Sequence, residues 1–259
     1  MQRQGTQVAR RPVKRRRATK SLRGRGRARN RRMTVPRNKL GFPQSMRATL
    51  RYTDPIAYNL NSVDAVFFQT FLANGMYDPQ VALGGHQPRG FDQYMDLYEK
   101  FTVLGSTISV NFVYEGYEGP TVETSTGFLT QNFVQTTAEP PALSPVTVGI
   151  HKGTGTPAAG TVSEWCEKDK QVWKVITPSS GAVTVSARMK CSDFFGKQAL
   201  VGSEGYTGNN TQDPVETVKY TVWCGRMSGN NAGLVRLRAY LTIQYDAVFT
   251  EPKILQPSR

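Results

Sequence analysis

Several stretches of the chain alternate between apolar and polar residues with a period of two. The longest is Leu234–Thr250, in which every second residue from Val235 to Phe249 is apolar. In a β-strand, successive side chains point to opposite faces, so sustained alternation predicts a strand with one face on a core. The same reasoning predicts strands over Arg47–Thr53, Thr107–Tyr114, Val183–Lys190 and Thr217–Cys224.

Weaker strand patterns lie at Gly127–Gln135 and Gln171–Thr177. Two short segments have helical spacing instead: Ser62–Ala73, with Ser62 as the N-cap, and Phe91–Tyr98. The turn-rich run Ser228–Gly233 between two long strands predicts a hairpin loop. About eight strands in roughly 220 residues predict an all-β protein, an eight-stranded jelly roll made of two antiparallel sheets.

The charge of the chain is concentrated at its N-terminus. The first 39 residues hold 16 Lys and Arg and no acid, and the first acid is Asp54. The other 220 residues hold 17 basic and 19 acidic residues, so a nearly neutral body carries a +16 segment. A segment with few large apolar residues and so many like charges cannot offset the entropy of ordering it. We therefore expect a disordered arginine-rich arm over residues 1–41 and one folded domain over residues 42–259.

Arginine presents a planar fork of donors to phosphate and stays charged at any physiological pH. A flexible arm of this kind is expected to follow a nucleic-acid backbone and to read no sequence. It contains no aromatic residue, so we expect no base stacking by it. A ribosomal-type extension, or a nuclear import signal alone, are simpler interpretations of the same charge. The predicted nucleic-acid-binding residues are Arg10, Arg11, Lys14, Arg15, Arg16, Arg17, Lys20, Arg23, Arg25, Arg27, Arg29, Arg31 and Arg32.

No pattern typical of an enzyme is present. The sequence contains two histidines and no nucleophile elbow, zinc-protease, Walker or dinucleotide motif. The first histidine, His86, lies in a Gly/Pro-rich loop, where a structural hydrogen bond or a subunit contact is the favoured role. We therefore expect neither catalytic residues nor a cofactor.

The three cysteines are odd in number and widely spaced, which indicates neither a zinc site nor a disulfide framework, although one bridge stays open. No apolar run is long enough to span a bilayer and no secretory signal precedes the body. We expect no metal site. Calcium at subunit contacts is a less favoured alternative to solvated or capping carboxylates for Asp54, Asp78, Asp92 and Asp96.

Three further stretches resemble a known family. They are Ala73–Pro79, Gly84–Gln93 and Tyr98–Ile108, and they occur together with the basic arm and the long strand Leu234–Thr250. These features resemble the capsid proteins of circovirus-like viruses, whose circular single-stranded DNA encodes a Rep protein. The resemblance covers roughly residues 1–114 and 215–252.

The resemblance implies a viral jelly roll that assembles into a small icosahedral shell, T=1 with about 60 copies. It also implies an inward-pointing arm and a nuclear localisation signal, assigned to Lys14, Arg15, Arg16 and Arg17. The implied partners are a single-stranded genome (DNA favoured), other copies of the chain, the host nuclear import machinery and an unidentified surface receptor, with no membrane insertion. The expected locations are the virion and, during assembly, the host nucleus.

Two alternatives stay open. One is the coat protein of a small single-stranded RNA virus, which would share the architecture. The other is a cellular nucleic-acid-binding β protein with a basic tail, which would stay monomeric or form a small oligomer.

Overall fold

A computed structural model describes residues 43–82, 85–118, 145–196, 200–227 and 234–254. The chain divides into two units, Met1–Arg37 and Asn38–Arg259, and every described residue belongs to the second. The predicted arm, the weak strand at Gly127–Gln135 and the turn at Ser228–Gly233 lie outside the described residues.

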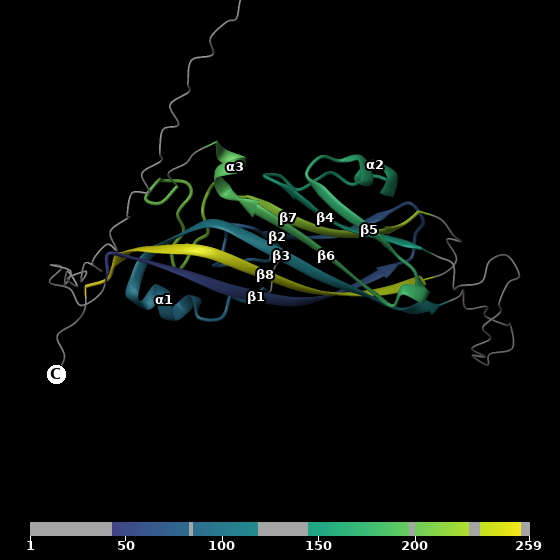
Figure 1. Ribbon diagram of the computed structural model, residues 1–259, viewed down its shortest axis with the longest axis horizontal. Helices are drawn as coiled ribbons and strands as arrows, with labels where there is room; N and C mark the ends of the chain where they lie inside the picture. The colour runs from purple at the N-terminus through teal and green to yellow at the C-terminus, as the bar shows by residue number, and fades with distance from the viewer. Residues whose placement is uncertain (1–42, 83–84, 119–144, 197–199, 228–233, 255–259) are drawn as a thin grey trace, which may run out of the picture. The chain divides into compact units, whose positions relative to one another are not determined.

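Eight strands form two four-stranded antiparallel sheets that pack face to face (Figure 1). The first sheet has the strand order β1-β8-β3-β6 and the second has the order β2-β7-β4-β5. The strands are β1 (Ser45–Leu60), β2 (Val66–Leu72), β3 (Tyr98–Glu118), β4 (Val146–Gly153), β5 (Gln171–Ile176), β6 (Ala182–Lys190), β7 (Lys219–Arg226) and β8 (Leu234–Pro252).

The pairing of these strands identifies the topology. Strand β1 pairs with β8, β2 with β7, β3 with β6, and β4 with β5, all antiparallel. The chain therefore behaves like one long hairpin whose four strand pairs are rolled into two sheets. This is the jelly roll, and the predicted all-β, two-sheet fold is confirmed.

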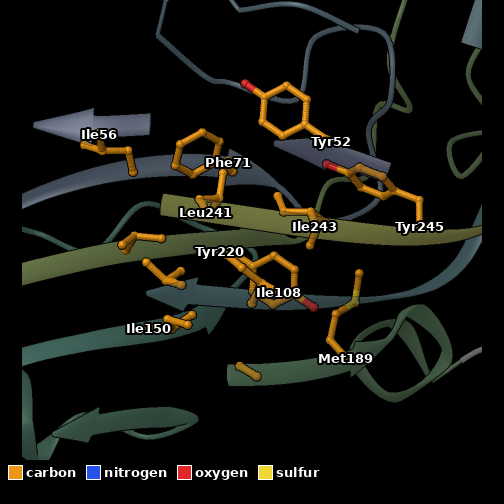
Figure 2. Packing of buried hydrophobic residues seen from close by; sticks show 14 of the residues in the cluster. Tyr52, Ile56, Phe71, Ile108, Ile150, Met189, Tyr220, Leu241, Ile243 and Tyr245 are labelled. Carbon is orange, nitrogen blue, oxygen red and sulfur yellow. The ribbon is translucent and has the colours of Figure 1, made fainter. Parts of the chain in front are cut away.

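The inner faces of the two sheets meet in one continuous apolar core (Figure 2). Every second residue of β8 from Val235 to Phe249 is buried in it, as the alternating pattern predicts. Three buried tyrosines also join the sheets by hydrogen bonds. The hydroxyl of Tyr245 donates to the carbonyl of Leu72 (2.8 Å). The Tyr220 hydroxyl donates to Ser106 O (2.9 Å), and the Tyr58 hydroxyl to Val222 O (3.1 Å). Burial raises the pKa of all three phenols, so they stay neutral donors.

The helices are short and connect strands. Helix α1 (Phe91–Leu97) confirms the helical spacing seen at Phe91–Tyr98. Helix α2 (Val162–Glu167) begins with a capping box, in which Thr161 and Glu164 satisfy each other's backbone N–H groups. Helix α3 (Cys191–Phe195) follows directly after β6, and a single 3₁₀ turn (Pro178–Ser180) separates β5 from β6.

The predicted helix at Ser62–Ala73 is wrong, because Val66–Leu72 is strand β2. Its outward side chain Phe68 stacks on Trp165 of α2, with ring centroids 5.4 Å apart, while Phe71 points into the core. Both faces of β2 therefore carry apolar residues, and the period of two disappears. No prediction covered β4, although Val146, Val148 and Ile150 alternate there with Thr147, Gly149 and His151.

Helix α2 lies over the outer face of the second sheet (Figure 1). Trp165 packs there against Trp223 of β7, with centroids 5.5 Å apart, and both are fully buried together with Val162. The outward-facing residues of this sheet under and beside α2 are here called the aromatic face. They are Val66, Phe68 and Thr70 of β2, Thr221 and Trp223 of β7, Thr147, Gly149 and His151 of β4, and Gln171, Trp173 and Val175 of β5.

The predicted hairpin between Thr217–Cys224 and Leu234–Thr250 is also wrong. Strands β7 and β8 are consecutive but belong to different sheets, so the segment between them connects the two layers. At the other side of the sandwich, two lysines of the second sheet reach the edge strand β6 of the first. The amine of Lys174 donates to Thr184 O (2.8 Å) and that of Lys152 to Arg188 O (3.2 Å).

Candidate nucleic-acid interface

The arm residues predicted to bind nucleic acid lie outside the described residues. The described domain adds a second basic surface that was not predicted from the sequence: the outer face of the sheet β1-β8-β3-β6, here called the polar face. It comprises Arg47, Thr49, Arg51, Thr53, Pro55, Ala57 and Asn59 of β1, Arg236, Arg238, Tyr240, Thr242, Gln244, Asp246 and Val248 of β8, Thr107, Ser109, Asn111, Val113 and Glu115 of β3, and Ala182, Thr184, Ser186, Arg188 and Lys190 of β6.

The polar face differs in charge from the rest of the domain. It carries six basic and two acidic residues, whereas residues 40–259 outside it carry the other 11 basic and 17 acidic residues. A net charge of +4 thus lies on one side of a sheet, and −6 is spread over the remainder. A positively charged surface attracts a polyanion at separations shorter than the Debye length, beyond which salt screens the attraction.

The basic residues gather at the two ends of the polar face. At one end, the strand registers place Arg51, Gln244, Thr107 and Arg188 in one row across the four strands. The next row runs from Thr49 through Asp246 and Gly105 to Lys190. Within the described residues, Arg51, Arg188 and Lys190 form no ion pair. Their charges are available to a ligand.

A depression of about 580 Å³ opens at this end of the face. Arg47, Arg188 and Lys190 line it together with the acid Asp246 and several polar groups, including Thr49, Thr107 and Gln244. Hydroxyl and amide groups beside cations match the mixed donors that contact sugar and phosphate oxygens.

Arg47 and Asp246 form an ion pair with two hydrogen bonds. Arg47 Nε donates to Asp246 Oδ1 (2.7 Å), and Arg47 Nη2 donates to Asp246 Oδ2. The hydrogen bonds from Arg47 and its charge lower the pKa of Asp246, and Arg188 lowers it further. The single acid of this end is therefore ionised near neutral pH and already paired. Arg47 is a weaker candidate for phosphate than Arg51 or Arg188, because its fork is occupied.

The opposite end carries Arg236 and Arg238 of β8. Arg238 Nε lies 2.8 Å from Glu115 Oε1, so part of this charge is also neutralised within the face. Between the two ends, Tyr240 projects from the middle of β8 and is 50% exposed. It lies in one row with Pro55, Asn111 and Thr184. An exposed aromatic ring between two basic regions can stack a nucleic-acid base, which the arm cannot do.

The other sequence candidates have structural roles. The ring nitrogens of His86 lie 3.0 Å from Gln87 O and 2.9 Å from Thr53 O, and the ring packs on Tyr52 at 4.6 Å, which confirms the expected structural contact. The three cysteines are free thiols. Burial raises the pKa of Cys191 to about 12 and that of Cys224 well above its ordinary value, so neither is a reactive thiolate.

No group of three metal-ligating side chains occurs among the described residues. Asp92 lies in the first turn of α1, where a carboxylate favours the helix dipole. None of the helices in the described part of the chain has the length and apolar character that a membrane crossing requires.

The sequence contains the cations of the polar face but does not show how they are arranged. Each strand predicted from alternation has an apolar and a polar set of residues, and the polar sets of Arg47–Thr53, Val183–Lys190 and Leu234–Thr250 hold the cations described above. What the sequence does not reveal is the strand order. Only the pairing of β1, β3 and β6 around β8 places those sets side by side on one surface.

No family model matches the chain, and no curated protein matches it either. Solved structures of similar fold include the Desmodium yellow mottle tymovirus, with 12% identity, 85% of this chain and 88% of that chain covered, and a TM-score of 0.36. The BFDV capsid protein, solved as a 60-mer, has 13% identity, 84% and 100% coverage, and a TM-score of 0.38. A semi-empty particle of the giant freshwater prawn Macrobrachium rosenbergii nodavirus has 13% identity, with 83% of this chain and 97% of that chain covered, and a TM-score of 0.36. Likenesses of this degree carry no argument about function.

Proposed function

We propose that this chain is a structural capsid protein that assembles into a closed shell and packages nucleic acid. The observation that carries the proposal is the union of two features in one chain: an eight-stranded jelly roll and a 39-residue segment of charge +16 without a single acid. Jelly rolls of this kind build viral shells. A tail with so many arginines and lysines suits a phosphate backbone.

The finer proposal follows the resemblance in the sequence. It is a circovirus-like coat protein whose shell is T=1 with about 60 copies, and whose cargo is circular single-stranded DNA. The arm residues Arg10–Arg32 bind the genome backbone, and Lys14–Arg17 direct the protein to the host nucleus. If about 60 arms share one shell, they contribute on the order of a thousand positive charges. Such charges repel one another unless cargo is present, so shell closure and genome binding are coupled.

The polar face of the domain is the second part of the proposed binding surface. The arm supplies most of the charge and no aromatic group, while the face supplies cations at its two ends and one exposed ring at Tyr240 between them. A rigid surface holds a strand of nucleic acid in a defined path, whereas a flexible arm only neutralises it. We therefore assign bulk neutralisation to the arm and ordered contacts to the face.

The test is electron microscopy of the purified full-length protein, with extraction of the nuclease-protected nucleic acid. Closed particles of one diameter are expected, and their cargo should be digested by DNase after release. A full-length variant with Gln at the thirteen arm positions loses both the repulsion between arms and the contacts to phosphate, so it should close without cargo and protect little nucleic acid. An Arg51→Gln/Arg188→Gln variant should still close and package, with a weaker hold on its cargo. Cargo digested by RNase instead would select the RNA-virus alternative. Soluble monomers that bind nucleic acid but never close would select the cellular binding module.

A further inference from the structure

A second basic site lies at the edge of the aromatic face, where Lys152 of β4 reaches across to β6. The loop after β4 and the turn between α2 and β5 line an open pocket of about 600 Å³. Its lining includes Lys152, Lys168, Lys170, His151 and one acid, Asp169, with Phe194 at its side. The remaining lining residues belong to the loop 153–157, Gly-Thr-Gly-Thr-Pro.

The imidazole of His151 is held at the wall of this pocket. A side chain on Gly153 would come within 2.9 Å of His151 Cε1, so the absence of a Cβ at residue 153 makes room for the ring. On its other side, the ring lies edge to face with Trp165, with centroids 6.5 Å apart. His151 Nδ1 is buried and has no hydrogen-bond partner among the described residues. This nitrogen is closed off from solvent, so the ring contributes its position in the wall of the pocket and no Nδ1 hydrogen bond to a bound anion.

The three lysines are fixed in place by other contacts. The amine of Lys168 lies 4.1 Å from the centroid of Trp165, and that of Lys170 lies 4.6 Å from the centroid of Phe194. Lys152 binds the carbonyl of Arg188 with one of its three N–H groups. The backbone of Lys170 has φ 57°, which residues other than glycine rarely adopt. Its carbonyl accepts a hydrogen bond from the backbone N–H of Lys152 (3.1 Å).

The charges of the pocket are not balanced within it. Burial lowers the pKa of His151, and the neighbouring Lys168 and Lys170 lower it further, so the ring is neutral at physiological pH. Three ammonium groups and one carboxylate leave a net charge of two. A doubly charged anion would neutralise this, and the glycine-rich loop would let it approach the backbone.

We propose that this pocket binds a doubly charged tetrahedral oxyanion, a sulfate or a phosphate monoester group, between Lys152, Lys168 and Lys170. The proposal does not depend on the capsid assignment. A dianion is favoured over the singly charged phosphodiester of a nucleic-acid backbone, because two net positive charges face it. Nucleic acid bound by the arm and the polar face is therefore not the expected occupant.

The probe is radiolabelled sulfate in equilibrium dialysis against the full-length protein, at an ionic strength held constant with NaCl. The wild type should bind one more saturable sulfate per chain than Lys168→Gln/Lys170→Gln. Loss of both amines should lower the affinity of the pocket for sulfate by about tenfold or more. The matched control is Lys100→Gln/Lys253→Gln, which removes the same charge outside the pocket and should bind like the wild type. Sulfate held by the arm is common to all variants and cancels. Lys168→Arg/Lys170→Arg retains the charge and should retain the sulfate.

A second readout uses the two histidines of the chain. An anion beside His151 raises its pKa, so sulfate should slow carbethoxylation of His151 at pH 6 and leave His86 unchanged, as mass spectrometry can resolve. Equal sulfate loss in the pocket and control variants would overturn the proposal, and so would equal protection of both histidines. Displacement of the pocket sulfate by an oligothymidylate without a terminal phosphate would overturn it as well, because the pocket would then bind phosphodiesters. Circular dichroism of each variant shows whether it has folded.

Discussion

The two sheets of this jelly roll share one core but have opposite outer faces. The polar face carries threonines, serines and cations in contact with solvent, whereas the aromatic face buries Trp165 and Trp223 under α2. The fold alone therefore does not decide what a sheet presents to its surroundings. The first sheet leaves its outer surface polar and open to solvent, with its cations at the two ends. The second uses its outer surface to build a small additional core.

The same contrast explains which strands could be predicted. The alternating segments Arg47–Thr53, Thr107–Tyr114, Val183–Lys190 and Leu234–Thr250 are the four strands of the first sheet, where polar residues face water. In the second sheet, alternation survives in β7 and in residues 146–151 of β4, which no prediction covered, whereas β2 looked helical. Alternation is clearest where one face meets solvent, and it is lost in β2 because apolar residues lie on both faces.

The largest expected effect comes from removing the centre of the aromatic face. Trp223→Ala deletes a fully buried indole that packs on Trp165. It should lower the free energy of unfolding by about 3–5 kcal/mol, through lost burial and the cavity that remains. Urea denaturation of the unassembled protein measures this. Trp173→Ala is the control, since this side chain is 45% exposed on the same face and should cost far less. Equal losses would mean that α2 does not shield the face.

A smaller effect is expected at the glycine beneath that indole. A Cβ at Gly149 would lie 2.5 Å from Trp223 Nε1, so Gly149→Ala forces the ring to shift. Overpacking of this kind costs about 1–3 kcal/mol. Gly155→Ala is the matched control, because nothing lies within 4 Å of its Cβ position. Thermal unfolding of both variants compares them, and a Gly149→Ala protein as stable as Gly155→Ala would contradict the packing.

The polar face should respond in the opposite way, with function changing and stability preserved. Arg51→Glu/Arg188→Glu reverses two exposed cations that form no ion pair with a described residue. Nucleic-acid affinity should fall, and the slope of log affinity against log salt should decrease by about one for each phosphate that the variant no longer neutralises. Filter binding over a range of salt measures this, with Lys219→Glu on the second sheet as the control. An unchanged slope would remove the face from the binding surface.

The smallest expected effect concerns the ion pair within the polar face. The pKa of Asp246 is lowered in the folded protein, so its pairing with Arg47 stabilises the fold above the pKa of the unfolded chain. This contribution is lost as the pH falls through the lowered pKa of the folded state. In Asp246→Asn, that part of the acid-induced loss should be absent. Because the Arg47 side chain is 66% exposed and that of Asp246 is 37% exposed, solvent screens the pair and it contributes little. Unfolding curves of the Arg47→Gln, Asp246→Asn and double variants test it, and a large coupling would contradict this expectation.

The site was less predictable than the fold. The charge of the arm follows directly from the sequence, and its thirteen candidate residues stay a prediction. The cations of the polar face were visible as single residues, yet nothing in their spacing shows that Arg51 of β1 and Arg188 of β6 lie in one row. Long-range strand pairing, which no local pattern encodes, creates the polar face. The lysine pocket is more local, because β4, α2 and β5 are consecutive and His151 pairs with Gln171. The sequence did not show that the connection between these strands folds back to bring Lys152 and Lys168 to one pocket.

The two lysines that reach across to β6 have a consequence for how copies of the chain can meet. An exposed edge strand is a template on which another chain can add its own strand without limit. Here Lys174 and Lys152 already occupy the carbonyls of Thr184 and Arg188, so a newcomer must displace two cations before it can pair. Sheet extension through β6 is therefore obstructed. Neighbouring copies are left to meet through side chains on this flank, a kind of contact that closes into a finite object more readily than a growing ribbon does.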